Sequence, residues 1–237
     1  MSKKNFDDIM DVVGGLGRKR VYVGFVMDHS GSMMAERENA MKGFNEQILK
    51  IKEESDSVDT FVTVVEFDDQ AKILFKNTNV TDIPLQITYW IGGSTALYDS
   101  IAKCISLIQQ DFDAFSGDKA VLLFIETDGQ ENLSTEFKGE EGRLKINKMI
   151  KELEDSGKWT ITFLGQRIDQ EYAADLGFAA MNTMSFNNRD YANRVVVNSI
   201  HTYYSTIKET DTRGVMGLME AAVTETQSQG YADEEKK

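Results

Sequence analysis

Residues 21–32 read VYVGFVMDHSGS, and this stretch decides the predicted fold. It begins with a nearly continuous apolar run, Val21–Met27, that has the length of a strand. Such runs are typical of parallel strands that are covered by helices on both faces. The run passes directly into the polar segment 28–32. We therefore expect a buried strand whose carboxyl end carries a polar turn, which is where open parallel sheets bind their ligands.

Similar apolar runs recur along the chain and alternate with amphipathic helical patterns. The further strand candidates are Phe61–Phe67, Ala120–Ile125 and Trp159–Leu164, with Phe178–Ser185 as a weaker one. Apolar residues at helical spacing predict four helices, whose stripes begin at Met41, Leu97, Ile146 and Ala192.

A short run at Ala71–Phe75 follows the run at Phe61–Phe67 after only Asp68, Asp69 and Gln70. A parallel crossover needs about a dozen residues or more, so these two runs should form an antiparallel hairpin. Everything else alternates strand and helix. The sequence thus predicts an α/β fold with a doubly wound, mostly parallel six-stranded sheet. This Rossmann-like sheet has one antiparallel edge strand and helices on both faces.

The alternating pattern covers residues 20–208, which we predict to form one domain. Residues 1–19 are then an N-terminal extension, and 209–237 are an acidic C-terminal tail that we expect to be mobile. Val215–Val223 could form two helical turns within this tail. For these turns, packing on the domain's own flank is favoured over binding a partner.

The composition argues against several functions. A formal net charge of −13 repels the phosphates of nucleic acid and the surface of anionic membranes. The longest apolar run is far shorter than the roughly 20 residues of a membrane-spanning helix. A single cysteine, Cys104, excludes an intramolecular disulfide and fits a reducing compartment, so we expect a cytoplasmic protein. With two histidines, the chain cannot build a structural Cys/His zinc site, and any metal must be held mainly by oxygen.

Oxygen-bearing side chains gather where the predicted strands end. Asp28, Ser30 and Ser32 alternate along the turn after the first strand, so an extended backbone places them on one side. Thr95 precedes the second predicted helix, and Asp128 follows the strand at 120–125. In a doubly wound sheet these two strands are neighbours, which would bring both aspartates into one crevice. Carboxylates and hydroxyls are hard donors that suit Mg²⁺, and also Mn²⁺ or Ca²⁺.

The set Asp28-x-Ser30-x-Ser32, Thr95 and Asp128 resembles the metal-ion-dependent adhesion site (MIDAS) of von Willebrand factor A (vWA) domains. The resemblance covers about residues 20–208. It is closer to the intracellular bacterial and phage branch than to the secreted adhesion branch, on stretches such as 93–99 (GSTALYD) and 163–165 (FLG).

This resemblance implies how the site would work. Ser30, Ser32 and Thr95 would contact the metal through their hydroxyls, while Asp28 and Asp128 would act largely through water. The remaining coordination position would accept a Glu or Asp from a partner protein. The expected function is a divalent-cation-dependent protein interaction module that is not an enzyme.

Two other functions compete with this interpretation. One is a metal-dependent phosphohydrolase that uses Asp28 as nucleophile or Mg²⁺ ligand. Such chemistry usually needs a second acid two residues further on, where this chain has Ser30. The chain also has no phosphate-binding loop motif and no G-x-S-x-G nucleophile motif. The other is an assembly subunit whose metal site is vestigial.

Several polar residues near this set have ordinary explanations. His29 is expected to be exposed and to point away from the metal, and Cys104 to be an inert core thiol. Asp99 should either favour the amino end of its helix or support the metal site. The remaining acids should form a solvated rim, or alternatively select a partner that carries its carboxylate among basic residues: Asp68, Asp69, Glu131, Glu136, Glu140 and Glu141.

Overall fold

A computed structural model describes residues 18–85, 92–168, 170–210 and 214–229. Its centre is a six-stranded sheet in the order β3-β2-β1-β4-β5-β6. All neighbouring strands are parallel except β2 and β3, which pair antiparallel at one edge. The strands are β1 (Lys19–Asp28), β2 (Val58–Phe67), β3 (Ala71–Asn79), β4 (Lys119–Thr127), β5 (Trp159–Gln166) and β6 (Thr183–Phe186). The predicted fold class is confirmed, including the hairpin at the sheet edge.

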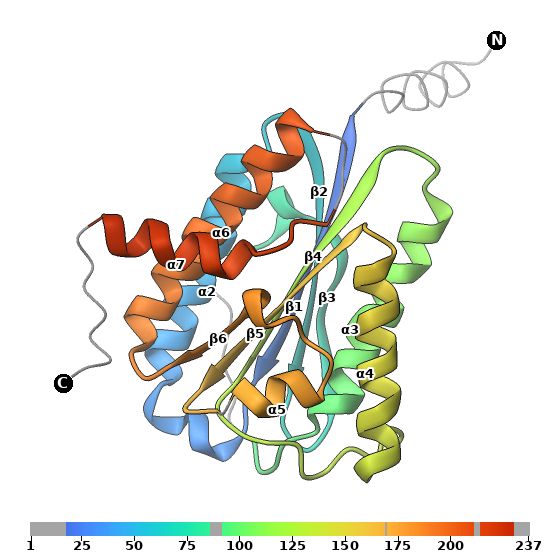
Figure 1. Ribbon diagram of the computed structural model, residues 1–237, viewed down its shortest axis with the longest axis vertical. Helices are drawn as coiled ribbons and strands as arrows, with labels where there is room; N and C mark the ends of the chain where they lie inside the picture. The colour runs from blue at the N-terminus through green and yellow to red at the C-terminus, as the bar shows by residue number, and fades with distance from the viewer. Residues whose placement is uncertain (1–17, 86–91, 169, 211–213, 230–237) are drawn as a thin grey trace.

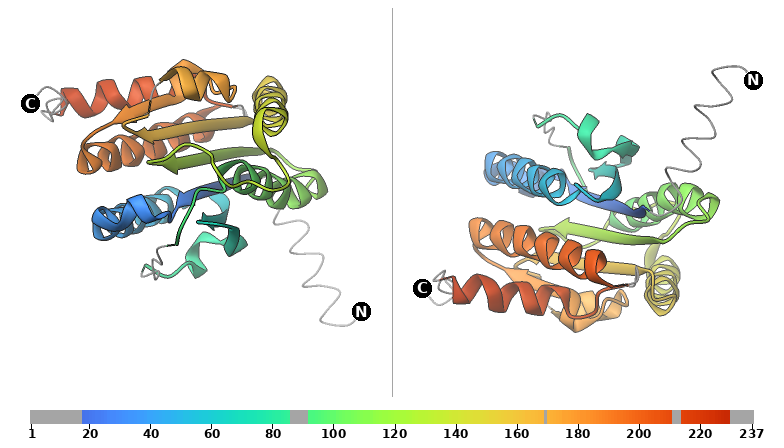
Figure 2. Two further views of the ribbon diagram at one scale, coloured as in Figure 1. Left: turned by 90° about the horizontal axis from the view of Figure 1, so that it is seen from below. Right: turned by 90° about the horizontal axis from the view of Figure 1, so that it is seen from above.

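Helices cover both faces of this sheet (Figures 1 and 2). One face carries α2 (Arg37–Glu54), α6 (Arg189–Glu209) and α7 (Leu218–Ser228), and the other carries α3 (Leu97–Ala114), α4 (Gly139–Asp155) and α5 (Gln170–Asp175). Short 3₁₀ turns are η1 (Gly31–Ala35), η2 (Val80–Asp82) and η3 (Ala180–Asn182). Each face of the sheet therefore has its own apolar core.

The central strand β1 shows why its apolar run is nearly continuous. Val23 and Phe25 pack into the core beneath α2 and α6, whereas Tyr22 and Val26 pack into the core beneath α3. Gly24 lies where α3 approaches closely, since a Cβ there would lie 2.8 Å from Ile108 Cδ1. With both faces buried, polar residues are confined to the end of the strand.

Part of the C-terminal region is folded and not a mobile tail, which agrees with the helical turns predicted at Val215–Val223 and with their favoured packing on the domain's own flank. Residues 218–228 form helix α7, which packs against α6 and buries Leu218, Met219 and Ala222 in the same core as α2. Asn182 Oδ1 accepts a hydrogen bond from the Leu218 amide at 3.0 Å. Apolar residues at one-turn spacing give this segment enough buried surface to fold onto the flank of the sheet. The domain boundaries themselves stay predictions, and residues 1–17 and 230–237 lie outside the described residues.

A buried ion-pair cluster joins α2 to α6 at the end far from the polar turns. Glu54 is only 8% exposed and contacts Lys50 at 2.8 Å, His201 at 2.6 Å and Lys208 at 3.2 Å. Burial alone raises the pKa of Glu54. Hydrogen bonds from the three basic side chains outweigh this effect and lower the pKa from 4.5 to about 2. Ionised Glu54 therefore stabilises the folded state.

Replacing Glu54 with Gln should lower the free energy of unfolding by about 2 kcal/mol at neutral pH, because three basic groups lose a buried anion. The folded pKa lies below the unfolded one, so the stabilisation is complete above about pH 4.5 and is lost as the pH falls toward 2. Urea unfolding from pH 7 to 3 measures this difference. Glu53→Gln, at the neighbouring exposed position, is the matched control and should change little. Equal effects of the two substitutions would contradict the assignment.

Candidate functional site

The ends of β1 and β4 form the floor of the candidate site. The two strands pair in parallel up to Met27 opposite Glu126, so both chains turn away from the sheet at the same edge. This edge lies at the bottom of Figure 1. Asp28 is the last residue of β1, and Asp128 directly follows β4. The predicted adjacency of these two strands is therefore present in the structure.

Hydrogen bonds connect four of the five predicted residues, three through their side chains and Asp28 through the backbone amide of Ser30. Ser30 Oγ lies 3.0 Å from Ser32 Oγ, and Ser32 Oγ donates to Asp128 Oδ1 at 2.6 Å. Asp28 is held by its own turn, because Oδ1 accepts from the Ser30 amide at 2.7 Å. Its Oδ2 accepts from Thr127 Oγ1 at 2.5 Å. Thr127 was missed in the sequence, although its place one residue before Asp128 offered a signal.

Thr95 lies beside these residues because backbone hydrogen bonds hold the loop that precedes it against the turn after β1. The Gly92 amide donates to the carbonyl of His29 at 2.8 Å, and the Gly31 amide donates to that of Gly93 at 3.3 Å. These bonds fasten the loop before α3 to the turn after β1. A Cβ on Gly129 would lie 3.4 Å from Thr95 Oγ1, so the Thr95 hydroxyl faces the turn after Asp128. The structure thus brings all five predicted residues to one edge of the sheet.

The acids of the β2–β3 turn hold the Thr95 loop in place. The carbonyl of Asp68 accepts from the Ala96 amide at 2.9 Å, and Asp69 Oδ1 accepts from the Ser94 amide at 2.5 Å. Gly92 packs so closely on Asp68 that a Cβ would lie 2.2 Å from that side chain. These two residues are therefore built into the site's wall and are more than the solvated rim expected from the sequence.

Two other acids shape the loop that follows β4. Glu131 accepts hydrogen bonds from the amides of Tyr98, Leu133 and Ser134, at 2.9, 2.8 and 2.5 Å. Asp99 accepts from the amides of residues 135, 136 and 137, at 2.7, 3.2 and 2.8 Å. Asp99 thus has a third role that the sequence analysis did not consider. Both carboxylates satisfy backbone donors that a loop would otherwise leave without partners.

The expectation that His29 is exposed was wrong. His29 is 2% exposed, and its Nε2 lies 3.6 Å from Glu66 Oε1. The His29 amide donates to the Phe67 carbonyl at 2.7 Å, so the pairing of β1 with β2 continues past the end of the strand and buries this residue. Burial raises the pKa of Glu66 to about 7. Cys104 is buried as expected, and burial raises the pKa of its thiol.

A buried arginine, Arg189, supports the strand ends that carry the site. This residue was missed in the sequence analysis. Arg189 is the first residue of α6 and is 4% exposed. Its guanidinium contacts Glu126 at the end of β4, Gln166 Oε1 at 3.2 Å and Glu36 Oε2 at 3.6 Å. It therefore ties α6 to the ends of β4 and β5 and to the segment after η1. Only its position beside a predicted helix start could have drawn attention to it.

The donor set suits a hard divalent cation. Among the described residues, no group of three or more His, Cys, Asp or Glu side chains is arranged to hold a metal. The five residues supply two carboxylates and three hydroxyls, which are oxygen donors that Mg²⁺, Mn²⁺ and Ca²⁺ accept. Burial raises the pKa of Asp28, and the charge of Asp128 raises it further. A cation between them would offset both effects, so the residues present fit the implied metal.

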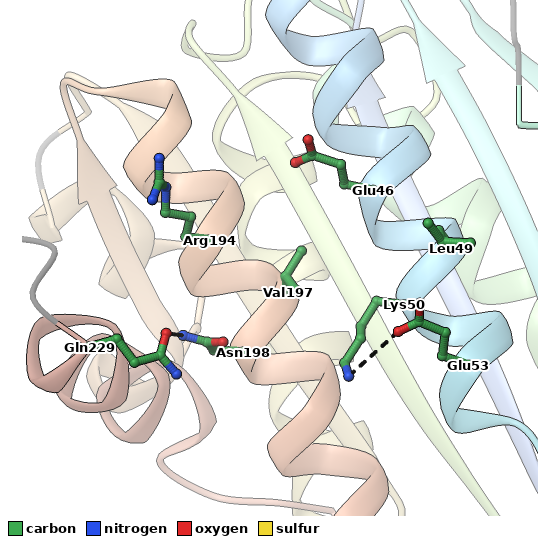
Figure 3. A pocket seen from close by; sticks show the side chains of 8 residues that line it. All are labelled: Glu46, Leu49, Lys50, Glu53, Arg194, Val197, Asn198 and Gln229. Atoms are coloured by element: carbon green, nitrogen blue, oxygen red, sulfur yellow. Dashed lines mark hydrogen bonds and ion pairs between the residues drawn. The ribbon is translucent and has the colours of Figure 1, made fainter.

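Among the described residues, one surface cleft lies beside this site, and one groove lies away from it. A cleft of about 490 Å³ lies beside the Thr95 loop and is lined by residues such as Asp69, Lys103 and Glu136. A groove of about 320 Å³ lies between α2 and α6 (Figure 3). The polar side chains of the groove largely contact one another, as Lys50 does with Glu53 at 3.8 Å. None of the five candidate residues lines the groove.

Comparison with known proteins supports the fold and little beyond it. No protein-family model matches the chain, and no curated protein matches its sequence. Among solved structures, proximal thread matrix protein 1 from the mussel byssus has a TM-score of 0.54 at 18% identity, over 79% of this chain and 47% of that chain. The ArnB paralog VWA2 from Sulfolobus acidocaldarius has a TM-score of 0.51 at 15% identity, over 76% and 44%. The pilus adhesin SpaC from Lactobacillus rhamnosus GG has a TM-score of 0.60 at 12% identity, over 78% and 30%.

These structural neighbours include vWA-domain proteins, and one structure of the mussel protein has a zinc-occupied MIDAS motif. At such low identity the likeness concerns the fold alone. The chain spans less than half the length of these neighbours. Within the part of the chain that the structure describes, no helix is both long and apolar enough to cross a membrane.

Asp99→Ala should loosen the loop after β4, because three backbone amides lose their acceptor. We expect amide exchange at residues 135–137 to become about tenfold faster or more, with a loss of about 2 kcal/mol in the free energy of unfolding. Hydrogen-exchange mass spectrometry measures both. Asp113→Ala, at an exposed position near the other end of α3, is the control and should leave exchange unchanged. Unchanged exchange in Asp99→Ala would refute this role.

Proposed function

We propose that this chain is a vWA-type interaction module that binds a divalent cation and uses it to dock an acidic residue of a partner protein. Mg²⁺ is the favoured ion, with Mn²⁺ or Ca²⁺ as alternatives. Ser30, Ser32 and Thr95 would hold it through their hydroxyls, and Asp28 and Asp128 largely through water. The observation that carries the proposal is the hydrogen-bonded chain from Ser30 through Ser32 to Asp128 across two neighbouring strand ends.

The chemistry of the donors favours docking of a carboxylate. Two aspartates balance the charge of a divalent ion, and hydroxyls add no further negative charge. A cation bound in this way retains affinity for one more anionic ligand. Asp28 is held in one orientation by the Ser30 amide and the Thr127 hydroxyl. Ser32 is exposed, so the site opens to solvent, where a partner can approach.

Exposed apolar side chains near the site suit a protein partner. Met34, two residues after Ser32, is 66% exposed, and Leu133, whose amide donates to the Thr95 carbonyl, is 40% exposed. An interface needs apolar surface of this kind around a polar centre. The structural neighbours from a mussel byssus matrix and from a bacterial pilus add general support for a role in protein assembly.

Two parts of the proposal rest on the sequence. The single cysteine supports a cytoplasmic location. The stretches at 93–99 and 163–165 support the intracellular bacterial or phage branch. We also propose that the module is not an enzyme, because Ser30 stands where a second acid would be needed two residues after Asp28, and His29 lies beside Glu66. Turnover of a simple phosphate ester that disappears in Asp28→Asn would instead support the phosphohydrolase.

Calorimetric titration with Mg²⁺ or Mn²⁺ tests the proposal. The unaltered chain should bind one ion, and both Asp28→Ala and Thr95→Ala should weaken binding by about tenfold or more. Circular dichroism should show that both variants remain folded. Asp113→Ala removes the same charge from an exposed position on α3 and should bind the ion normally. Absence of saturable binding to the unaltered chain would mean that the site is vestigial.

A further inference from the structure

The cleft of about 490 Å³ beside the proposed metal site has a composition of its own. Three segments line it: the β2–β3 turn, the first two turns of α3, and the loop after β4. Its ionisable side chains are three acids, Asp69, Asp99 and Glu136, and one base, Lys103. Leu133 adds an exposed apolar wall. The cleft is therefore negatively charged with one apolar side.

The cleft adjoins the metal site through shared structure. Asp69 binds the amide of Ser94, the residue before Thr95, at 2.5 Å. The Leu133 amide donates to the Thr95 carbonyl at 3.2 Å. Asp99 lies four residues after Thr95, and one turn of helix rises only about 5.4 Å. A partner segment that binds at the proposed metal therefore has the cleft within its reach.

The acids of the cleft are not equally available to a ligand. Asp99 already accepts hydrogen bonds from three backbone amides, and Asp69 uses Oδ1 for the Ser94 amide. Glu136 is exposed and contributes its charge at the outer edge. Lys103 offsets only part of this charge. An arginine or lysine of a partner could place its charged group between Asp69 and Glu136 and its aliphatic stem on Leu133.

We propose that this cleft binds a basic side chain that lies near the docking carboxylate in the partner's sequence. The inference rests on the proposed function, because the position of the partner's acidic residue at the metal determines which of its neighbouring residues lies in the cleft. An extended segment advances about 3.3 Å per residue, so the basic residue should lie within about three residues of the acid. The preferred partner thus carries a Glu or Asp with an Arg or Lys close by. A purely acidic segment would be repelled.

A library of short peptides with one fixed central Glu and varied flanking residues tests this specificity. The full chain is incubated with the library in Mg²⁺ and, in parallel, in excess chelator. Arg and Lys should be enriched about threefold near the Glu among peptides that are retained only with Mg²⁺. In Glu136→Gln the enrichment should fall to about half or less, while Mg²⁺-dependent retention of Glu peptides persists, because Glu136 is exposed and lies outside the proposed metal site.

A matched control separates the cleft from the overall charge of −13. Glu141→Gln removes one exposed acid on α4, outside the cleft, and should keep the enrichment. Charge reversal gives a stricter test, since Glu136→Lys should shift the preference from basic toward acidic flanking residues. Both results together would locate the selection in the cleft.

Three outcomes would overturn the inference. Glu peptides could be retained with Mg²⁺ but without a basic preference. The preference could survive unchanged in Glu136→Gln, or it could be lost equally in the α4 control. Each of these results leaves the metal-docking function standing. Absence of any Mg²⁺-dependent retention would instead refute the proposed function, and the inference with it.

Discussion

The parallel pairing of β1 with β4 is the constraint on which the site depends. Asp28 and Asp128 are separated by a hundred residues of sequence, and only this pairing brings them to one edge of the sheet. The pairing is in turn enforced by apolar runs that bury both faces of each strand, so polar side chains are left only at the strand ends. Burial raises the pKa of Asp28, although hydrogen bonds from Ser30 and Thr127 lower it in part, and the neighbouring charge of Asp128 raises it further. A divalent cation between Asp28 and Asp128 would favour the ionised form of both carboxylates, which the proposed metal site requires.

The acids around the site give the surface its negative charge and also hold the surrounding loops in place. Asp69, Asp99 and Glu131 accept hydrogen bonds from backbone amides of the two loops that carry or support Thr95. Charged acceptors make stronger hydrogen bonds than neutral ones, so these loops gain order without a core of their own. The same carboxylates give the neighbouring cleft its charge. Structural support and partner selection thus draw on the same side chains.

Much of the fold could be predicted from the sequence because strand runs, helical stripes and the short link at 68–70 are local patterns. The meeting of the five candidate residues at one edge of the sheet could be predicted for the same reason, since each lies at the end of such a pattern, whereas their role as metal ligands stays a prediction. The remaining features depend on how distant segments meet. The burial of His29 against Glu66, the contact of Arg189 with Glu126, and the amides that Asp99 binds all follow from the paths of loops, which local spacing does not determine. Apolar spacing at 215–223 did indicate a helix on the domain's flank, but its contact with α6 in particular depends on the tertiary arrangement.

The most direct measurement of the central claim is anomalous diffraction from crystals of the full chain soaked in Mn²⁺. The account predicts a single strong peak at the carboxyl edge of β1 and β4, with the hydroxyl oxygens of Ser30 and Ser32 at coordination distance, about 2.2 Å. Thr95 and the two aspartates should surround the same peak, directly or through ordered water. Strong peaks elsewhere, with none between Asp28 and Asp128, would contradict the account.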